Sequence, residues 1–67
     1  MANFKKVNQA LGLAFPFLDI ECVKGDGYAY FLGKDADQVA SVYSNPSSTS
    51  TDDMIRMSIE EVSECYP

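Results

Sequence analysis

A short glycine-containing segment, Gly25–Gly27, lies between two runs of residues that favour β-strands, and it restricts the fold more than any other feature. Gly-Asp-Gly is the kind of segment that closes a β-hairpin, because glycine takes the positive φ that tight turns demand. The run before it, Phe17–Lys24, alternates apolar and charged residues over much of its length, as a half-buried strand does. The run after it, Tyr28–Leu32, is rich in aromatic residues. The sequence therefore predicts a β-hairpin near the middle of the chain.

The sequence leaves two registers open for this hairpin. A two-residue turn, Asp26-Gly27, pairs Cys22 with Phe31 and leaves Tyr30 on the outer face. A three-residue loop instead pairs Cys22 with Tyr30 and turns Phe31 outward. A slip of one residue moves every side chain to the other face of a strand. In either register one large aromatic residue lies on the outer face beside acidic residues.

Two segments with apolar residues at helical spacing flank the hairpin. The first is predicted to form a helix over residues 2–15, which Pro16 ends because the residue before a proline is pushed out of the α region. Ser50 or Thr51 is predicted to cap the last helix, and Asp53 completes a capping-box-like arrangement with Ser50. The predicted apolar stripes are Phe4, Val7, Leu11, Ala14 and Phe15 in the first helix and Ile55, Ile59, Val62 and Tyr66 in the second.

The segment Val39–Tyr43 carries β-branched and aromatic residues and is predicted to form a third strand. Polar residues 33–38 connect it to the hairpin, and the loop 45–50 leads to the last helix. The 67 residues then form one α+β domain in the order α-β-β-β-α. The simplest packing is a two-layer sandwich, in which an antiparallel three-stranded sheet carries both helices on one face. The opposite sheet face is left open and is expected to be a contact surface.

Acidic residues outnumber basic ones by ten to five, which gives a net charge of −5, and histidine is absent. Proteins that bind nucleic acids or anionic membranes need clustered cations, so we expect neither kind of direct binding here. No apolar run approaches the roughly 20 residues that span a bilayer. The acidity either serves solubility or steers the protein onto a basic partner.

Two cysteines, Cys22 and Cys65, are too few for a disulfide-built domain and are expected to be free thiols of a cytoplasmic protein. No charged segment followed by an apolar run opens the sequence, so we expect no secretory leader.

Groups for catalysis are scarce. Without histidine, Ser-His and Cys-His nucleophile pairs cannot form within one chain, and we expect neither enzyme activity nor a cofactor. The segment Asp35–Asp37 begins like a calcium loop, but the central glycine and the closing glutamate are missing, so we expect no metal site. Aromatic residues near the predicted sheet serve either as core or as interface anchors.

The segment Gly27–Gly33, with the sequence Gly-Tyr-Ala-Tyr-Phe-Leu-Gly, resembles a recurring element of small, mostly uncharacterised proteins of tailed phages and prophages. Those proteins carry a G-[YF]-x-Y-F strand after an acidic-apolar strand, followed by a short strand of the Ser-Val-Tyr type, which is here Ser41–Tyr43. The resemblance implies a phage setting, in which very short acidic proteins bind and block host macromolecules such as CRISPR effectors. Some of them present carboxylates where phosphates would sit.

These observations predict a non-enzymatic, anti-CRISPR-like binding protein that blocks a basic, nucleic-acid-binding site of a host defence complex in the host cytoplasm. The alternative is a small structural or accessory protein that forms a homodimer or larger homo-oligomer through its open sheet face. The residues expected to bind a host protein with a basic surface are Asp35, Asp37, Asp52, Asp53, Glu60, Glu61 and Glu64, with Tyr30 as the aromatic anchor.

Overall fold

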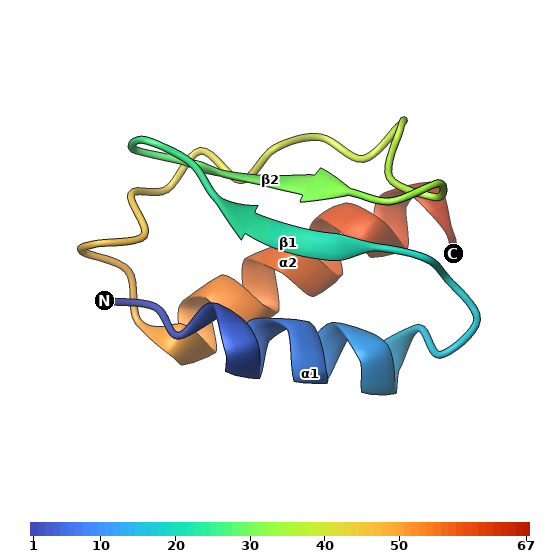
Figure 1. Cartoon of the computed structure of the whole chain (residues 1–67), viewed down its shortest axis with the longest axis horizontal. Helices are drawn as coiled ribbons and strands as arrows, with labels where there is room; N and C mark the ends of the chain where they lie inside the picture. The colour runs from blue at the N-terminus through green and yellow to red at the C-terminus, as the bar shows by residue number, and fades with distance from the viewer.

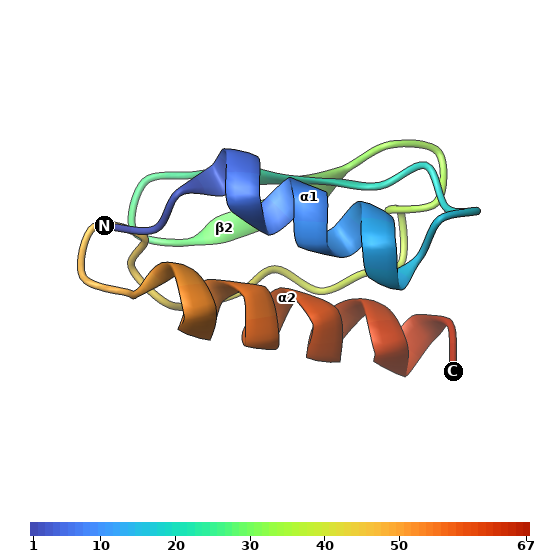
Figure 2. The ribbon, with the colours of Figure 1, turned by 90° about the horizontal axis from the view of Figure 1, so that it is seen from below.

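The computed structural model describes residues 1–67 and contains two helices and a two-stranded antiparallel sheet. In chain order these are α1 (Phe4–Ala14), β1 (Glu21–Lys24), β2 (Ala29–Leu32) and α2 (Thr51–Cys65). Figure 1 shows both helices on the same side of the hairpin. Figure 2, from below, shows α1 and α2 side by side and running in the same direction across the sheet. The predicted α+β class is confirmed.

The hairpin adopts the register of a two-residue turn. Cys22 lies opposite Phe31, and both are buried. Gly27 has a φ of +84°, which glycine adopts without the steric penalty that other residues meet. Tyr30 is consequently on the outer face, away from the helices. The register of a three-residue loop, which would have turned Phe31 outward, is therefore wrong.

The strand predicted over Val39–Tyr43 is not formed, so the order α-β-β-β-α is also wrong. Val42 alone pairs with β2, exchanging two backbone hydrogen bonds with Ala29 (2.8 and 2.9 Å). The Val39 N–H donates instead to the Ala36 carbonyl (3.1 Å), within a series of turns. Residues 33–39 thus form turns, and the contact with β2 is the single bridge between Ala29 and Val42.

The residues before β1 form a tight turn instead of the first half of a strand. The Leu18 N–H donates to the Phe15 carbonyl (3.2 Å), and Pro16 occupies the second turn position, which suits its fixed φ. The strand predicted from Phe17 therefore begins only at Glu21. Phe17, at the tip of the turn, is 96% exposed.

The apolar stripe predicted for α1 is confirmed at its centre, where Val7 and Leu11 are fully buried. Phe4 and Phe15 are partly buried at its two ends and pack against the core. Ala14, on the same stripe, is exposed.

The stripe predicted for α2 is rotated relative to the buried face of the helix. Val62 is buried as predicted, but Met54 and Ser58 are the other fully buried residues. Ile55 and Ile59 are only partly buried at the margin of the core. The centre of the buried face therefore follows the row 54, 58 and 62, because α2 packs against α1 and its Ser58 also contacts Cys22 of β1.

Candidate functional site

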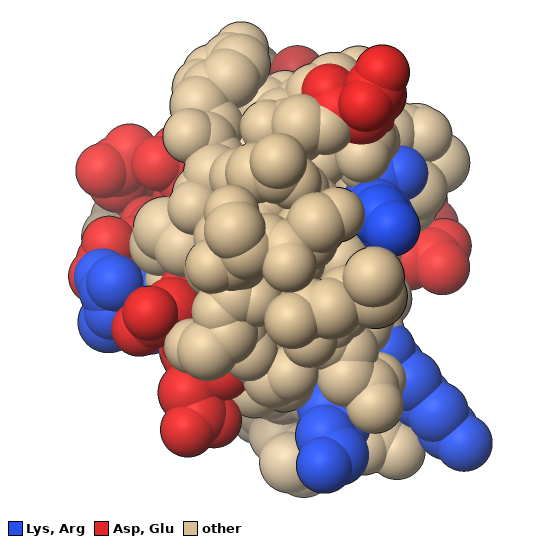
Figure 3. Space-filling view, turned by 90° about the vertical axis from the view of Figure 1, so that its left-hand side faces the viewer, with Lys and Arg blue, Asp and Glu red and all other residues tan.

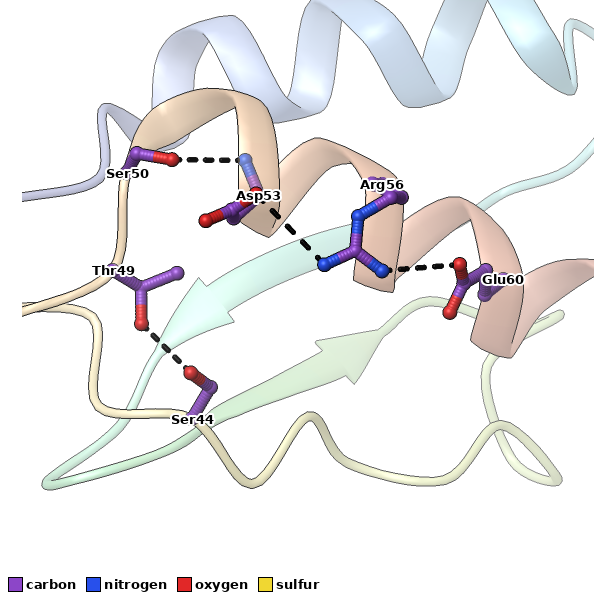
Figure 4. Close-up of polar contacts among 6 residues, drawn as sticks. All are labelled: Ser44, Thr49, Ser50, Asp53, Arg56 and Glu60. Carbon is purple, nitrogen blue, oxygen red and sulfur yellow. Dashed lines mark hydrogen bonds and ion pairs between the residues drawn. The ribbon is translucent and has the colours of Figure 1, made fainter.

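The N-terminal end of α2 places two acidic side chains in solvent. Asp52 and Asp53 lie in its first turn, where the helix dipole favours negative charge. The Asp53 N–H donates to Ser50 Oγ (3.1 Å), which confirms the predicted cap. The preceding loop is held by a hydrogen bond between the Ser44 and Thr49 hydroxyls (2.7 Å), and Figure 4 shows both contacts.

A single cation, Arg56, lies among the carboxylates of α2. Its guanidinium is 3.2 Å from Glu60 and 3.8 Å from Asp53, so it bridges two successive turns of the helix (Figure 4). Both pairs are exposed, and pairs of this kind contribute less than about 1 kcal/mol to stability. No motif in the sequence marks Arg56 as a site residue, although its spacing of three and four residues from the two carboxylates predicts both contacts.

The C-terminal end of α2 gathers acidic residues from a distant part of the chain. The Tyr66 hydroxyl donates to the Asp35 carbonyl (2.8 Å), and Cys65 Sγ donates to the Gln38 carbonyl (3.2 Å). These contacts dock the loop that carries Asp35 and Asp37 onto the end of α2. Partial burial raises the pKa of Tyr66 above its ordinary value, and the negative charge of the neighbouring Asp35 adds to this shift. No pattern in the sequence pointed to this contact.

The predicted acidic residues differ in how free they are to meet a partner. Glu60, Glu64 and Asp37 are exposed, whereas Glu61 is half-buried. Asp35 is also half-buried, and its carboxylate accepts a hydrogen bond from the Asp19 N–H (2.6 Å). Asp35 therefore holds the loop in place as well as contributing charge.

Tyr30 does not belong to this acidic surface. It lies on the outer face of the hairpin, with its ring centroid 5.9 Å from that of Tyr28. Both helices lie on the other side of the hairpin (Figure 1). The structure thus divides the predicted site into an acidic surface, formed by α2 and the loop 35–37, and a separate aromatic face.

Charge is unevenly distributed over the molecule. Figure 3 shows several acidic side chains along one edge with a cation among them, cationic side chains on the opposite edge and at the bottom, and a largely uncharged surface in the middle; further acidic side chains lie at the top and on the edge opposite the main group. The acidic side chains do not converge into a group that could hold a metal ion, and the surface has no pocket. Neither helix combines the length and apolar character that crossing a membrane requires.

Comparison with known proteins gave no match to a protein-family model, a curated protein or a solved structure.

Proposed function

We propose that this chain is a non-enzymatic binding protein of phage origin, whose acidic surface blocks a basic, nucleic-acid-binding site of a host defence complex such as a CRISPR effector. The observation that carries the proposal is the charge of α2, which sets five carboxylates against one cation, Arg56. The carboxylates are those of Asp52, Asp53, Glu60, Glu61 and Glu64.

The spacing of these charges supports mimicry of a phosphate backbone. The 15 residues of α2 extend roughly 22 Å at the rise of an α-helix. Five carboxylates over that length give about one per 4–5 Å, near the one phosphate per 3.4 Å of a DNA strand. Asp53, Glu60 and Glu64 also lie within about 40° of one another around the helix axis. A row of cations arranged for phosphates can therefore meet several of these carboxylates together.

The C-terminal end of α2 concentrates negative charge further. The last turn carries no basic residue, so nothing offsets the negative end of the helix dipole. Asp35 and Asp37 reach the same end through the contact between Tyr66 and the Asp35 carbonyl. We therefore expect electrostatic attraction to orient this end of α2 toward a basic site before the two proteins make contact.

The test is competition with target DNA for purified CRISPR effector complexes, measured by gel mobility shift. The wild-type chain should release DNA, and release should weaken as salt screens the charges. Glu60→Lys combined with Glu64→Lys changes the net charge from −5 to −1 and should abolish release. Both residues are exposed, so the double substitution should leave the melting temperature nearly unchanged.

A matched control separates the position of the charge from its amount. Glu21→Lys combined with Asp26→Lys makes the same change in net charge at exposed positions of the hairpin. This control variant should bind the effector complex more slowly but should still release the DNA. If no effector complex responds to the wild-type chain, or if the α2 variant releases DNA as well as the wild type, the proposal is wrong.

A further inference from the structure

Three tyrosine rings form a continuous strip on the outer face of the hairpin. The ring of Tyr28 lies in the middle, with its centroid 5.9 Å from that of Tyr30 and 6.5 Å from that of Tyr43. Tyr43 is 86% exposed and Tyr28 is 36% exposed. We call this set of three residues the tyrosine strip. It takes no part in the core or in the acidic surface of α2.

The backbone holds the tyrosine strip in place. Tyr28 lies directly across the turn from Gly25, and its ring is so close that a Cβ on Gly25 would come within 2.8 Å of it. Tyr43 follows Val42, which is fixed to β2 by two hydrogen bonds with Ala29. A strip fixed in this way loses little conformational entropy when it is covered.

The surroundings of the strip are apolar and poor in charge. The strand alternation places Val23 and Leu32 on the same face, and Leu32 is 50% exposed. Glu21, opposite Leu32, is the one charged residue that this alternation puts there. The carboxylates of α2 belong to the other layer of the molecule (Figure 1).

We propose that the tyrosine strip and its apolar surroundings are a homodimer interface, in which two copies of this chain pack sheet against sheet. In a two-fold symmetric contact the same patch meets itself, so a patch whose charges all have one sign repels its own copy. The strands put one carboxylate, that of Glu21, on this face, and Asp26 lies in the turn at its end, so repulsion between two copies is much smaller than for the five carboxylates of α2. The dimer would have four layers, with the two sheets inside and both acidic helices turned outward and free.

The order of the rings gives the contact a specific arrangement. Because Tyr28 lies between the other two, a two-fold axis near Tyr28 places Tyr30 of one copy against Tyr43 of the other. Tyrosine suits such a contact, because its ring supplies apolar area while its hydroxyl can stay hydrated or find a partner.

The size of the face sets the expected affinity. The molecule measures 29 × 20 × 17 Å, so its largest face is small. Specific interfaces bury about 1,200–2,000 Å² in total, and two flat faces of 29 × 20 Å fall just below that range. We therefore expect a weak dimer that forms at roughly micromolar to millimolar concentration.

Sedimentation equilibrium of the full chain, from about 1 μM to about 1 mM, tests the proposal. The wild type should shift from monomer to dimer, and raising the salt from about 0.15 M to about 1 M should not weaken the dimer, because screening reduces the repulsion between two chains of charge −5. Tyr43→Ser should stay monomeric over the whole range. Its thermal melt should match the wild type, because Tyr43 packs mainly against Tyr28 and is mostly in solvent.

Phe17→Ser is the matched control, since it removes another highly exposed aromatic ring, at the turn between α1 and β1. It should dimerise like the wild type. A wild type that remains monomeric at about 1 mM, or a Tyr43→Ser variant that dimerises as well as the wild type, would overturn the proposal. So would a dimer that Phe17→Ser abolishes, because the contact would then lie at the turn.

Discussion

The side-chain amide of Asn8 in α1 pairs with the main chain of Cys22 in β1. The Cys22 N–H donates to Asn8 Oδ1 (2.7 Å), and Asn8 Nδ2 donates to the carbonyls of Cys22 (3.0 Å) and Phe4 (3.0 Å). A helix side chain thus takes the place that a neighbouring strand would have at the edge of β1. The contact ties α1 to the sheet and satisfies backbone groups that could otherwise pair with another chain.

Replacing Asn8 with alanine should destabilise the fold by about 1–3 kcal/mol, because the Cys22 N–H and carbonyl lose their partners in a part-buried position. Urea denaturation followed by circular dichroism measures the change. Gln9→Ala, at the next and exposed position of α1, should stay within about 0.5 kcal/mol of the wild type. Equal stabilities of the two variants would show that the amide pairing is unimportant.

Two glycine substitutions should act in opposite directions. Gly33 has a φ of +123°, and a Cβ there would lie against the Asp19 carbonyl oxygen, well inside van der Waals contact, so Gly33→Ala should unfold much of the population. Gly12 is exposed on α1, and no atom lies within 4 Å of the place that an alanine methyl would take, so Gly12→Ala should stabilise the chain by about 0.5–1 kcal/mol. Thermal melts of both variants decide the matter. A tolerated Gly33→Ala would contradict the close approach to Asp19.

Truncation of the buried row of α2 should cost more than truncation of its margin. Met54 is fully buried, and Met54→Ala should destabilise by about 2–5 kcal/mol through lost contacts and a cavity. Ile59 is only partly buried, so Ile59→Ala should cost distinctly less. Denaturant midpoints of the two variants give the order, and the reverse order would mean that α2 presents its Ile59 face to the core.

Alkaline pH should destabilise the fold through Cys22. Burial raises the pKa of the Cys22 thiol above its ordinary value of 9.0, the hydrogen bond with Ser58 opposes this shift, and the charge of Glu21 adds to it. The folded state holds this proton more tightly than the unfolded chain does. The contribution of the protonated thiol to the free energy of unfolding is therefore complete below about pH 9 and is lost as pH rises through the pKa of the folded state. Urea unfolding at rising pH should show a steeper loss for the wild type than for Cys22→Ala. Parallel pH profiles would exclude a role for this thiol.

The two thiols should differ in reactivity in the native state. Both are free, but Cys22 is buried and Cys65 is only half-buried. A thiol reagent should therefore modify Cys65 first and reach Cys22 only after denaturation, with no reductant needed for either. Mass spectrometry of the timed reaction follows both sites. Simultaneous modification would mean that the core around Cys22 opens as readily as the C-terminus.

Features that depend on neighbouring residues could be predicted from the sequence. Ser50 caps α2, Pro16 follows the end of α1, and the glycine-containing turn closes a hairpin, because each acts through contacts within a few residues. Glu60, Glu61 and Glu64 all lie off the predicted apolar stripe. Glu60 and Glu64 are exposed as this predicts, whereas Glu61 is half-buried. The hairpin register could not be decided in this way, because both turns were locally allowed. The observed register buries Phe31, which has no polar group that needs a hydrogen-bond partner. It leaves the Tyr30 hydroxyl on the solvent-facing side of the hairpin.

Features that join distant parts of the chain were decided only by the tertiary structure. The rotation of α2 brings Ser58 to Cys22, 36 residues away in sequence, with Sγ and Oγ 3.6 Å apart. The Tyr66 hydroxyl brings Asp35 to the end of α2 across 31 residues. Tyr30 is separated from the acidic surface because one strand face turns toward the helices and the other toward solvent. Periodicity determines which residues share a face of one element, whereas the contact between faces depends on how helices and hairpin fill a common core, and that packing is a property of the whole chain.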